Sequence, residues 1–214
     1  MCNGGIFVLG NKKLLKEYDF ILEAAIVVAI FAIVIIAIAI PLNLLYTKSD
    51  SIENSDLPSE YKITNDKNYF EYQSWYLSPA YASAYVLRSL KVDAKGDDVV
   101  IQEQFGIFSP NAICSLFDKC GFKATAYNGD LDSLKMRLTQ GVPIIAYITV
   151  QSETQYVVVK GYDEEYIYLA DSIIQNINEV TLWYNRKIPI ARFEELWKTD
   201  TKLKDNVYIV VENA

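Results

Sequence analysis

Hydrophobic and polar positions divide this chain into three parts. The first part carries an unbroken apolar run of 17 residues from Ala24 to Ile40, AAIVVAIFAIVIIAIAI. At a rise of 1.5 Å per residue the run spans about 26 Å, close to the roughly 30 Å hydrocarbon core of a bilayer. We therefore predict one transmembrane helix within residues 20–46, with residues 1–19 as a separate N-terminus.

The basic residues around this run predict its orientation. Lys12, Lys13 and Lys16 precede the run, and only Lys48 follows it closely. This bias predicts a cytoplasmic N-terminus, a single pass through the cell membrane, and the rest of the chain outside. A cleaved signal peptide and a buried core helix are the alternatives. Residues 37–39, Ala-Ile-Ala, resemble a cleavage site, but the apolar run is longer than a signal peptide requires.

Polar residues dominate the second part, residues 47–68, with the sequence TKSDSIENSDLPSEYKITNDKN. Its Ser, Asn, Asp and Pro residues favour a solvated backbone over a packed element. We predict a polar linker here, followed by a folded domain over residues 69–214.

Cap residues placed before apolar stripes predict three helices in the domain. Ser78 and Ser109 each stand before a proline, the order expected of an N-cap and a first helical residue. Asp130 stands before a stripe of leucines, and Gly141 provides a stop. The predicted helices run from Ser78 to about Leu90, from Ser109 to near Gly121, and from Asp130 to Gly141.

Strand patterns follow these helices. Segments rich in β-branched and aromatic residues predict strands over residues 142–150, 156–162, 166–170 and 207–211, with a hairpin connection at 163–165 and a short helix over 191–198. Helices first and an antiparallel sheet afterwards define an α+β fold.

The net charge and the cysteine content limit the classes of partner and cofactor that the chain is expected to bind. The first 46 residues hold three lysines and three acidic residues, so the whole net charge of −7 falls on residues 47–214. An acidic domain argues against nucleic acid as a partner. Three scattered cysteines and no histidine predict no zinc site, and no cofactor is expected.

Ser78 also stands where thiol peptidases of the papain type place their nucleophile, at the N-terminus of a long helix. Such enzymes add a glutamine upstream that donates to the oxyanion and a histidine from the later sheet, oriented by Asp or Asn. The alternative interpretation of Ser78 is a plain helix cap.

Three segments resemble the bacteriocin-processing, or double-glycine, cysteine peptidases, the thirty-ninth family of that class. SPAYASAYVLRSL resembles the family's CGPAAAAMVLRYLG, and TQYVVVKGYDEEYIYLADS resembles GHYVVVVGYDDDGVVVNDP. Between them, GFKATAYNGDLDSLKMRLTQGVPIIAYI resembles the family's helix-turn-strand block. The resemblance covers residues 69–214 in the expected order and implies a papain-like fold.

The resemblance implies four site positions. The nucleophile falls on Ser78, the base on Gln155, the orienting carboxylate on Asp171 and the oxyanion glutamine on Gln73. Pro79 stands where the family usually has glycine. Without the resemblance, Gln73 and Gln155 are ordinary surface or strand-end residues, and Asp171 caps a turn.

The family's nucleophilic thiol is replaced by the hydroxyl of Ser78, and its basic imidazole by the amide of Gln155. We therefore predict a site without peptidase activity. Lys160 lies five residues from Gln155 and is predicted to face the other side of the sheet. An engineered Cys-to-Ser change explains Ser78 but not Gln155, which favours natural loss.

Three functions remain open. The first is a membrane-anchored pseudopeptidase that binds a peptide or protein, for which the tyrosines and Trp75 near the cleft are suited. The second is a weak serine-type hydrolase or acyltransferase that uses Ser78. The third is a structural or immunity-type membrane protein. The sequence favours the first, and leaves the ligand and the oligomeric state open.

Overall fold

The computed structural model describes residues 22, 25–35, 47–51, 56–64, 71–73, 77–99, 101, 109–173, 184–198 and 205–212. By its internal contacts the chain divides into two units, Met1–Asn43 and Leu44–Ala214. In the first unit residues 25–35 are helical, and their apolar side chains are exposed; Val28 is 68% exposed and Phe31 65%.

The described part of the chain contains no helix that is both long enough and apolar enough to cross a membrane. The remainder of the span predicted over residues 20–46, including 36–46, lies outside the described residues, as do residues 1–19. The membrane topology therefore stays a prediction.

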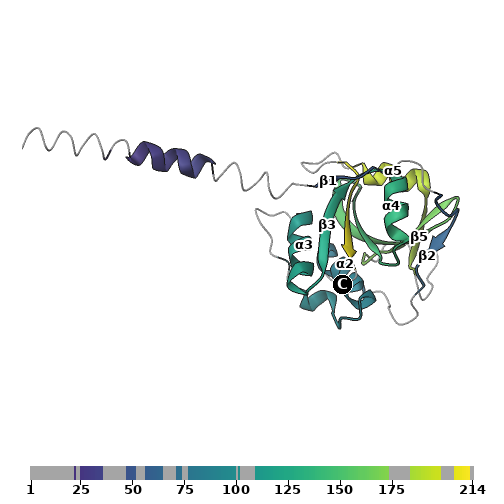
Figure 1. Ribbon diagram of the computed structural model, residues 1–214. Coiled ribbons are helices and arrows are strands. Elements are labelled where there is room, and N and C mark those ends of the chain that lie inside the picture. The colour runs from purple at the N-terminus through teal and green to yellow at the C-terminus, as the bar shows by residue number, and fades with distance from the viewer. Residues whose placement is uncertain are drawn as a thin grey trace, which may run out of the picture. The chain divides into compact units, whose positions relative to one another are not determined.

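The second unit is built on one eight-stranded sheet, drawn with its helices in Figure 1. Along the sheet the strands follow the order β1-β3-β8-β4-β5-β6-β7, and β2 pairs separately with β5. Neighbouring strands are antiparallel except β1 and β3, which are parallel. The strands are β1 (Lys48–Ser49), β2 (Tyr61–Lys62), β3 (Lys123–Asn128), β4 (Ile144–Val150), β5 (Glu153–Tyr162), β6 (Tyr166–Ala170), β7 (Arg186–Pro189) and β8 (Val207–Glu212).

The helices are α2 (Ser78–Ser89), α3 (Pro110–Lys119), α4 (Leu131–Leu138) and α5 (Ile190–Trp197), with a 3₁₀ turn η1 at Gly96–Asp98. Two of the predicted caps are confirmed. The Ser109 hydroxyl accepts the backbone N–H of Ala112, and Asp130 forms a capping box with Ser133. Gly121 and Gly141 follow α3 and α4 with φ of +86° and +85°, a conformation that only glycine adopts without strain.

Successive side chains of each strand point to opposite faces of the sheet, so they pack in two separate hydrophobic cores. On one face, Tyr156 and Val158 of β5 pack in a cluster with α2 and α3. On the other face, Val157 and Val159 pack in a cluster with α4 and α5. Each face of the sheet is thus covered by one pair of helices.

The α+β prediction is confirmed, but the sheet is mixed rather than antiparallel, and β3 precedes α4, so the order is not helices first and strands afterwards. Strand β5 begins three residues before the predicted start at Tyr156. A two-residue turn joins it to β4, and Gln151 and Ser152 both have positive φ there. Neither residue type signals such a turn, which is why the pattern missed the extension.

Part of the predicted linker is built into the domain. β1 pairs with β3, and β2 pairs with β5. Asp50 receives two hydrogen bonds from Arg137, at 2.9 and 3.1 Å, and one from the Tyr208 hydroxyl at 2.7 Å. Burial alone would raise the pKa of Asp50, but these hydrogen bonds outweigh it and hold that pKa below its ordinary value. A short polar segment is therefore ordered by distant partners that its own sequence does not reveal.

Candidate functional site

Ser78 occupies the first turn of α2, but it does not cap the helix. The N-cap position is Leu77, and no side chain caps it. Ser78 is only 6% exposed, and its Oγ accepts the backbone N–H of Tyr156 at 3.0 Å. The prediction of a helix beginning here is confirmed, whereas the prediction that Ser78 is its N-cap is wrong, because the hydroxyl is used in a bond across the domain.

The end of β6 explains this bond. The last β5–β6 pair joins Val158 to Ala170, so β6 stops two residues short of Tyr156. The Tyr156 N–H is buried and needs an acceptor. The Ser78 hydroxyl supplies it, in place of a strand carbonyl, and thereby ties the start of α2 to β5.

Gln155 lies beside this contact on β5, opposite Ile148 of β4, and is 6% exposed. Among the hydrogen bonds of the described residues, none joins its side chain to Ser78 or to Asp171. An amide holds no proton-accepting nitrogen at neutral pH, so this side chain offers hydrogen bonds but not base catalysis.

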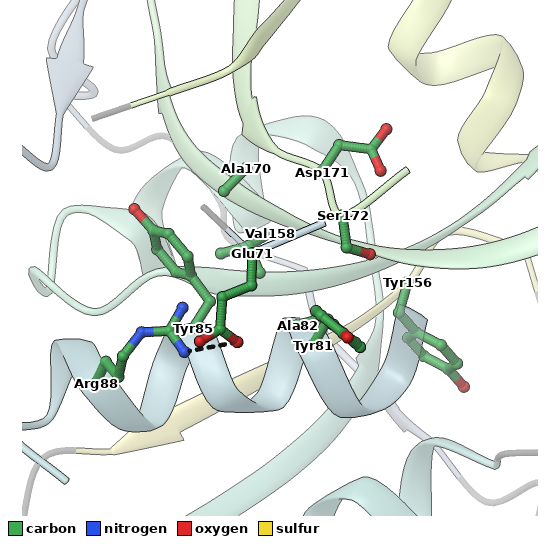
Figure 2. Close-up of a pocket in the computed structure, with 10 residues that line it drawn as sticks. All are labelled: Glu71, Tyr81, Ala82, Tyr85, Arg88, Tyr156, Val158, Ala170, Asp171 and Ser172. Carbon is green, nitrogen blue, oxygen red and sulfur yellow. Dashed lines mark ion pairs between the residues drawn. The ribbon is translucent and has the colours of Figure 1, made fainter. Parts of the chain in front are cut away.

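Asp171 follows the end of β6 and is 2% exposed. Its Oδ2 lies 2.7 Å from Nη1 of Arg186 on β7, and its Oδ1 accepts the N–H of Ile173 at 2.9 Å. Burial raises the pKa of Asp171 above its ordinary value, and Arg186 and the Ile173 N–H offset only part of that rise. The Asn185 side-chain amide makes two hydrogen bonds to the Asp171 backbone: its oxygen accepts the Asp171 N–H, and its nitrogen donates to the Asp171 carbonyl. The carboxylate is thus committed to an arginine, and Figure 2 shows it pointing away from α2.

Gln73 reaches the same region through its backbone. Its N–H donates to the Ser172 carbonyl at 2.9 Å, which lays the segment 71–73 along the end of β6. Within the described part of the chain, Gln73 Oε1 and Ser172 Oγ are both buried without a hydrogen-bond partner. The two residues joined by this backbone bond therefore each carry an unsatisfied buried polar atom.

A small pocket connects these parts between α2 and the ends of β5 and β6 (Figure 2). Its volume is about 10 Å³, roughly the room that one water molecule needs. Glu71 and Arg88 form an ion pair at 3.2 Å on its wall. Its lining residues are Glu71, Tyr81, Ala82, Tyr85, Arg88, Tyr156, Val158, Ala170, Asp171 and Ser172.

Two hydrogen bonds to backbone groups thus link the four candidate residues in two pairs, Ser78 with the region of Gln155 and Gln73 with the region of Asp171. Ser78 touches the residue after Gln155, and Gln73 touches the residue after Asp171. Their assigned roles remain predictions. Sequence analysis missed Arg186, because a cation on the short β7 carries no motif, and the partner of a buried carboxylate is known only once the strands are placed.

A helix that begins at Ser78 and packs against antiparallel strands, with Gln155 on β5 and Asp171 just after β6, is the arrangement of a papain-like peptidase domain. Residues 103–201 match the model of the Peptidase C39 family. This range includes Gln155 and Asp171 and begins after Gln73 and Ser78. None of the curated proteins matches the chain.

Solved structures with the same fold support this match. A C39-like peptidase from Bacillus anthracis has a TM-score of 0.54 at 14% identity, covering 72% of this chain and 98% of that one. The peptidase domain of Streptococcus ComA, a bifunctional ABC transporter involved in quorum sensing, has a TM-score of 0.54 at 13% identity, covering 69% and 99%.

A double-glycine-motif protease from an AMS/PCAT transporter, solved in complex with a leader peptide, has a TM-score of 0.50 at 16% identity, covering 68% and 91%. At these identities the likeness concerns the fold. The shared fold is the α+β papain-like fold of these C39 peptidase domains, and the match to the family model covers residues 103–201.

Proposed function

We propose that this chain is a membrane-anchored C39-like domain that binds a peptide or protein partner without cutting it. The observation that carries the proposal is the state of the nucleophile position. The Ser78 hydroxyl is buried and accepts a backbone N–H, and the chain holds no histidine to remove its proton.

A serine nucleophile needs a general base within hydrogen-bond reach. Nζ of Lys160 lies over the ring of Tyr85, which follows Ser78 by seven residues, about 10 Å along α2, so the amine lies well away from the Ser78 hydroxyl. Asp171 is held by Arg186. These contacts argue against the serine hydrolase or acyltransferase alternative.

Peptide binding is supported by two exposed side chains and one structural neighbour. Tyr72 and Leu77, each 36% exposed, directly precede Gln73 and Ser78. The transporter protease with the same fold was solved with a leader peptide. Because the pocket has room for about one water molecule, a peptide would lie across Tyr72 and Leu77 rather than insert a side chain.

Membrane attachment is supported by the helical residues 25–35, whose apolar side chains are exposed. Exposed apolar surface of this extent is stabilised by burial in hydrocarbon. We propose a single pass within residues 20–46, with the N-terminus in the cytoplasm and the domain outside. Protease added to intact cells should remove the domain, and carbonate washing should leave the chain in the membrane. Release by carbonate, or protection of the domain in intact cells, would contradict this topology.

Peptide binding is tested by titrating the full-length chain, in detergent, with a fluorescent peptide library of mixed charge. We expect saturable binding that Leu77→Ser and Tyr72→Ser each weaken at least five-fold. Met136→Ser on α4 is the matched control, since it removes a half-buried apolar side chain from the opposite face of the sheet. Equal weakening by all three variants, or no saturable binding, would refute the proposed surface.

A further inference from the structure

Lys160 is a buried amine at the interface between α2 and β5. Its side chain is 0% exposed, although it belongs to β5 in a region that is otherwise apolar. Its Nζ lies 4.8 Å from the ring centroid of Tyr85 on α2, and within the described residues it has no hydrogen-bond partner. The helix therefore covers the amine without giving it a hydrogen-bond acceptor.

The charged groups nearby do not balance a charge on Lys160. From α2, Arg88 also lies over the Tyr85 ring, at 5.7 Å, and is itself paired with Glu71. From β2, Lys62 is paired with Glu60 and lies over the ring of Tyr168 on β6. β4 contributes no charged side chain. These two cations have the same sign as a charged Lys160, and the carboxylates of Glu60 and Glu71 are already paired.

A buried ammonium without a counter-charge loses its proton more readily than an exposed one. Burial lowers the pKa of Lys160 from 10.5 to about 7. The Tyr85 ring favours the charged form, but a cation–π contact offsets only part of the lost hydration. While α2 covers it, the amine is therefore about half neutral at pH 7 and largely neutral at mildly alkaline pH, and it takes up a proton when α2 moves away.

We propose that Lys160 makes the packing of α2 on the sheet sensitive to pH, so that acidification from mildly alkaline to neutral pH loosens the helix that carries Ser78 and one wall of the pocket. The change moves one proton from solvent to Nζ as the helix opens and breaks no covalent bond. This inference does not depend on whether the site binds peptides. Because α2 forms one wall of the pocket of about 10 Å³, movement of the helix would enlarge the pocket.

The size of the effect follows from the two protonation equilibria. With a pKa of about 7 when α2 is closed and 10.5 when Lys160 is exposed, the opening equilibrium falls about 30-fold from pH 6 to pH 8.5. The contact with Tyr85 reduces this to about ten-fold. The chain contains no histidine, so among its other side chains only the thiol of cysteine has an ordinary pKa near this range, at its alkaline end, about 8.5.

The test is hydrogen exchange of α2 backbone amides in the full-length chain, at pH 6 and pH 8.5, corrected for intrinsic exchange rates. We expect α2 protection to rise at least five-fold with pH, while the protection of α4 amides that exchange by local opening stays constant. Lys160→Met should remove the dependence. Lys135→Met is the matched control, because Lys135 lies 4.9 Å from the Tyr162 ring yet is only half buried, and it should leave the dependence intact.

Constant α2 protection in the unaltered chain would overturn the inference, whatever the variants do. So would a pH dependence that persists in Lys160→Met. If Lys160→Met does not fold, Lys160→Gln and the unaltered chain still decide the question, because the expected rise is a property of the native sequence.

Discussion

Replacing Lys160 with methionine should stabilise the domain at neutral pH, although it removes a native side chain. A pKa lowered from 10.5 to about 7 corresponds to a penalty of about 5 kcal/mol for burying the charged form. At pH 7 the amine is about half neutral, which leaves about 4 kcal/mol, and the Tyr85 ring returns about 1 kcal/mol. The expected gain for Lys160→Met is therefore about 3 kcal/mol.

The direction in which the free energy of unfolding changes with pH follows from the same two pKa values. The folded pKa lies below the unfolded one, so between about pH 7 and pH 10 the unfolded state binds more protons, and stability rises with pH. From pH 7 to pH 9 the rise is about 2 kcal/mol. Burial raises the pKa of Cys114 from 9.0 to about 12, which lowers stability above pH 9, so the measurement should stop there.

Urea unfolding of the full-length chain, followed by the fluorescence of the buried Trp197, measures both effects. With an m-value of about 2 kcal/mol/M, the unaltered chain should gain about 1 M in midpoint between pH 7 and pH 9. Lys160→Met should start higher at pH 7 and change little with pH. A flat profile for the unaltered chain, or a Lys160→Met variant that is less stable at pH 7, would refute the reasoning.

Three further predictions concern contacts of the fold. Ser78→Ala should lower the free energy of unfolding by about 1–3 kcal/mol, because it leaves the buried Tyr156 N–H without an acceptor; Ser78→Thr, which keeps the hydroxyl, should lose less in the same urea assay. Asp50→Asn should lower the free energy of unfolding by about 1–3 kcal/mol at pH 7, because it weakens the hydrogen bonds from Arg137. This difference from the unaltered chain should shrink as the pH falls below 3.8, because folding lowers the pKa of Asp50 and protonation in acid removes the stability that this lowered pKa provides. Gly161→Ala should release β2, because its Cβ would meet a β2 carbonyl oxygen at 2.7 Å; limited proteolysis should then cut residues 56–64 faster, and an unchanged cutting rate would count against the pairing.

The two Ser-Pro pairs of this chain show what the sequence can and cannot predict. Both Ser78 and Ser109 stand at the beginning of a helix, and both helices were predicted correctly from local signals. Only Ser109 caps its helix. The Ser78 oxygen is taken by Tyr156, a residue 78 positions away, so its use depends on where β6 ends.

Long-range pairing also explains the other differences. β1 and β2 are two residues each and polar in sequence, so no periodicity can reveal them. β1 forms because it pairs with the otherwise open edge of β3 and because Arg137 and Tyr208 donate hydrogen bonds to Asp50. β2 forms because β5 extends past its last β4 partner, so that Gly161 and Tyr162 are open to pairing on that side. The four site positions came from a family resemblance, and the sequence could not show that Arg186 holds the carboxylate at Asp171.

The most direct test of the proposed function examines binding and cleavage together. The immobilised full-length chain would be incubated with a peptide library, and both the retained and the released peptides read by mass spectrometry. A Leu77→Ser column and a Met136→Ser column would serve as the site variant and its matched control. The proposal predicts that the unaltered and Met136→Ser columns retain intact peptides, that the Leu77→Ser column retains fewer, and that no new cleavage products appear on any column. Cleavage products from the unaltered chain that disappear with Ser78→Ala would contradict it.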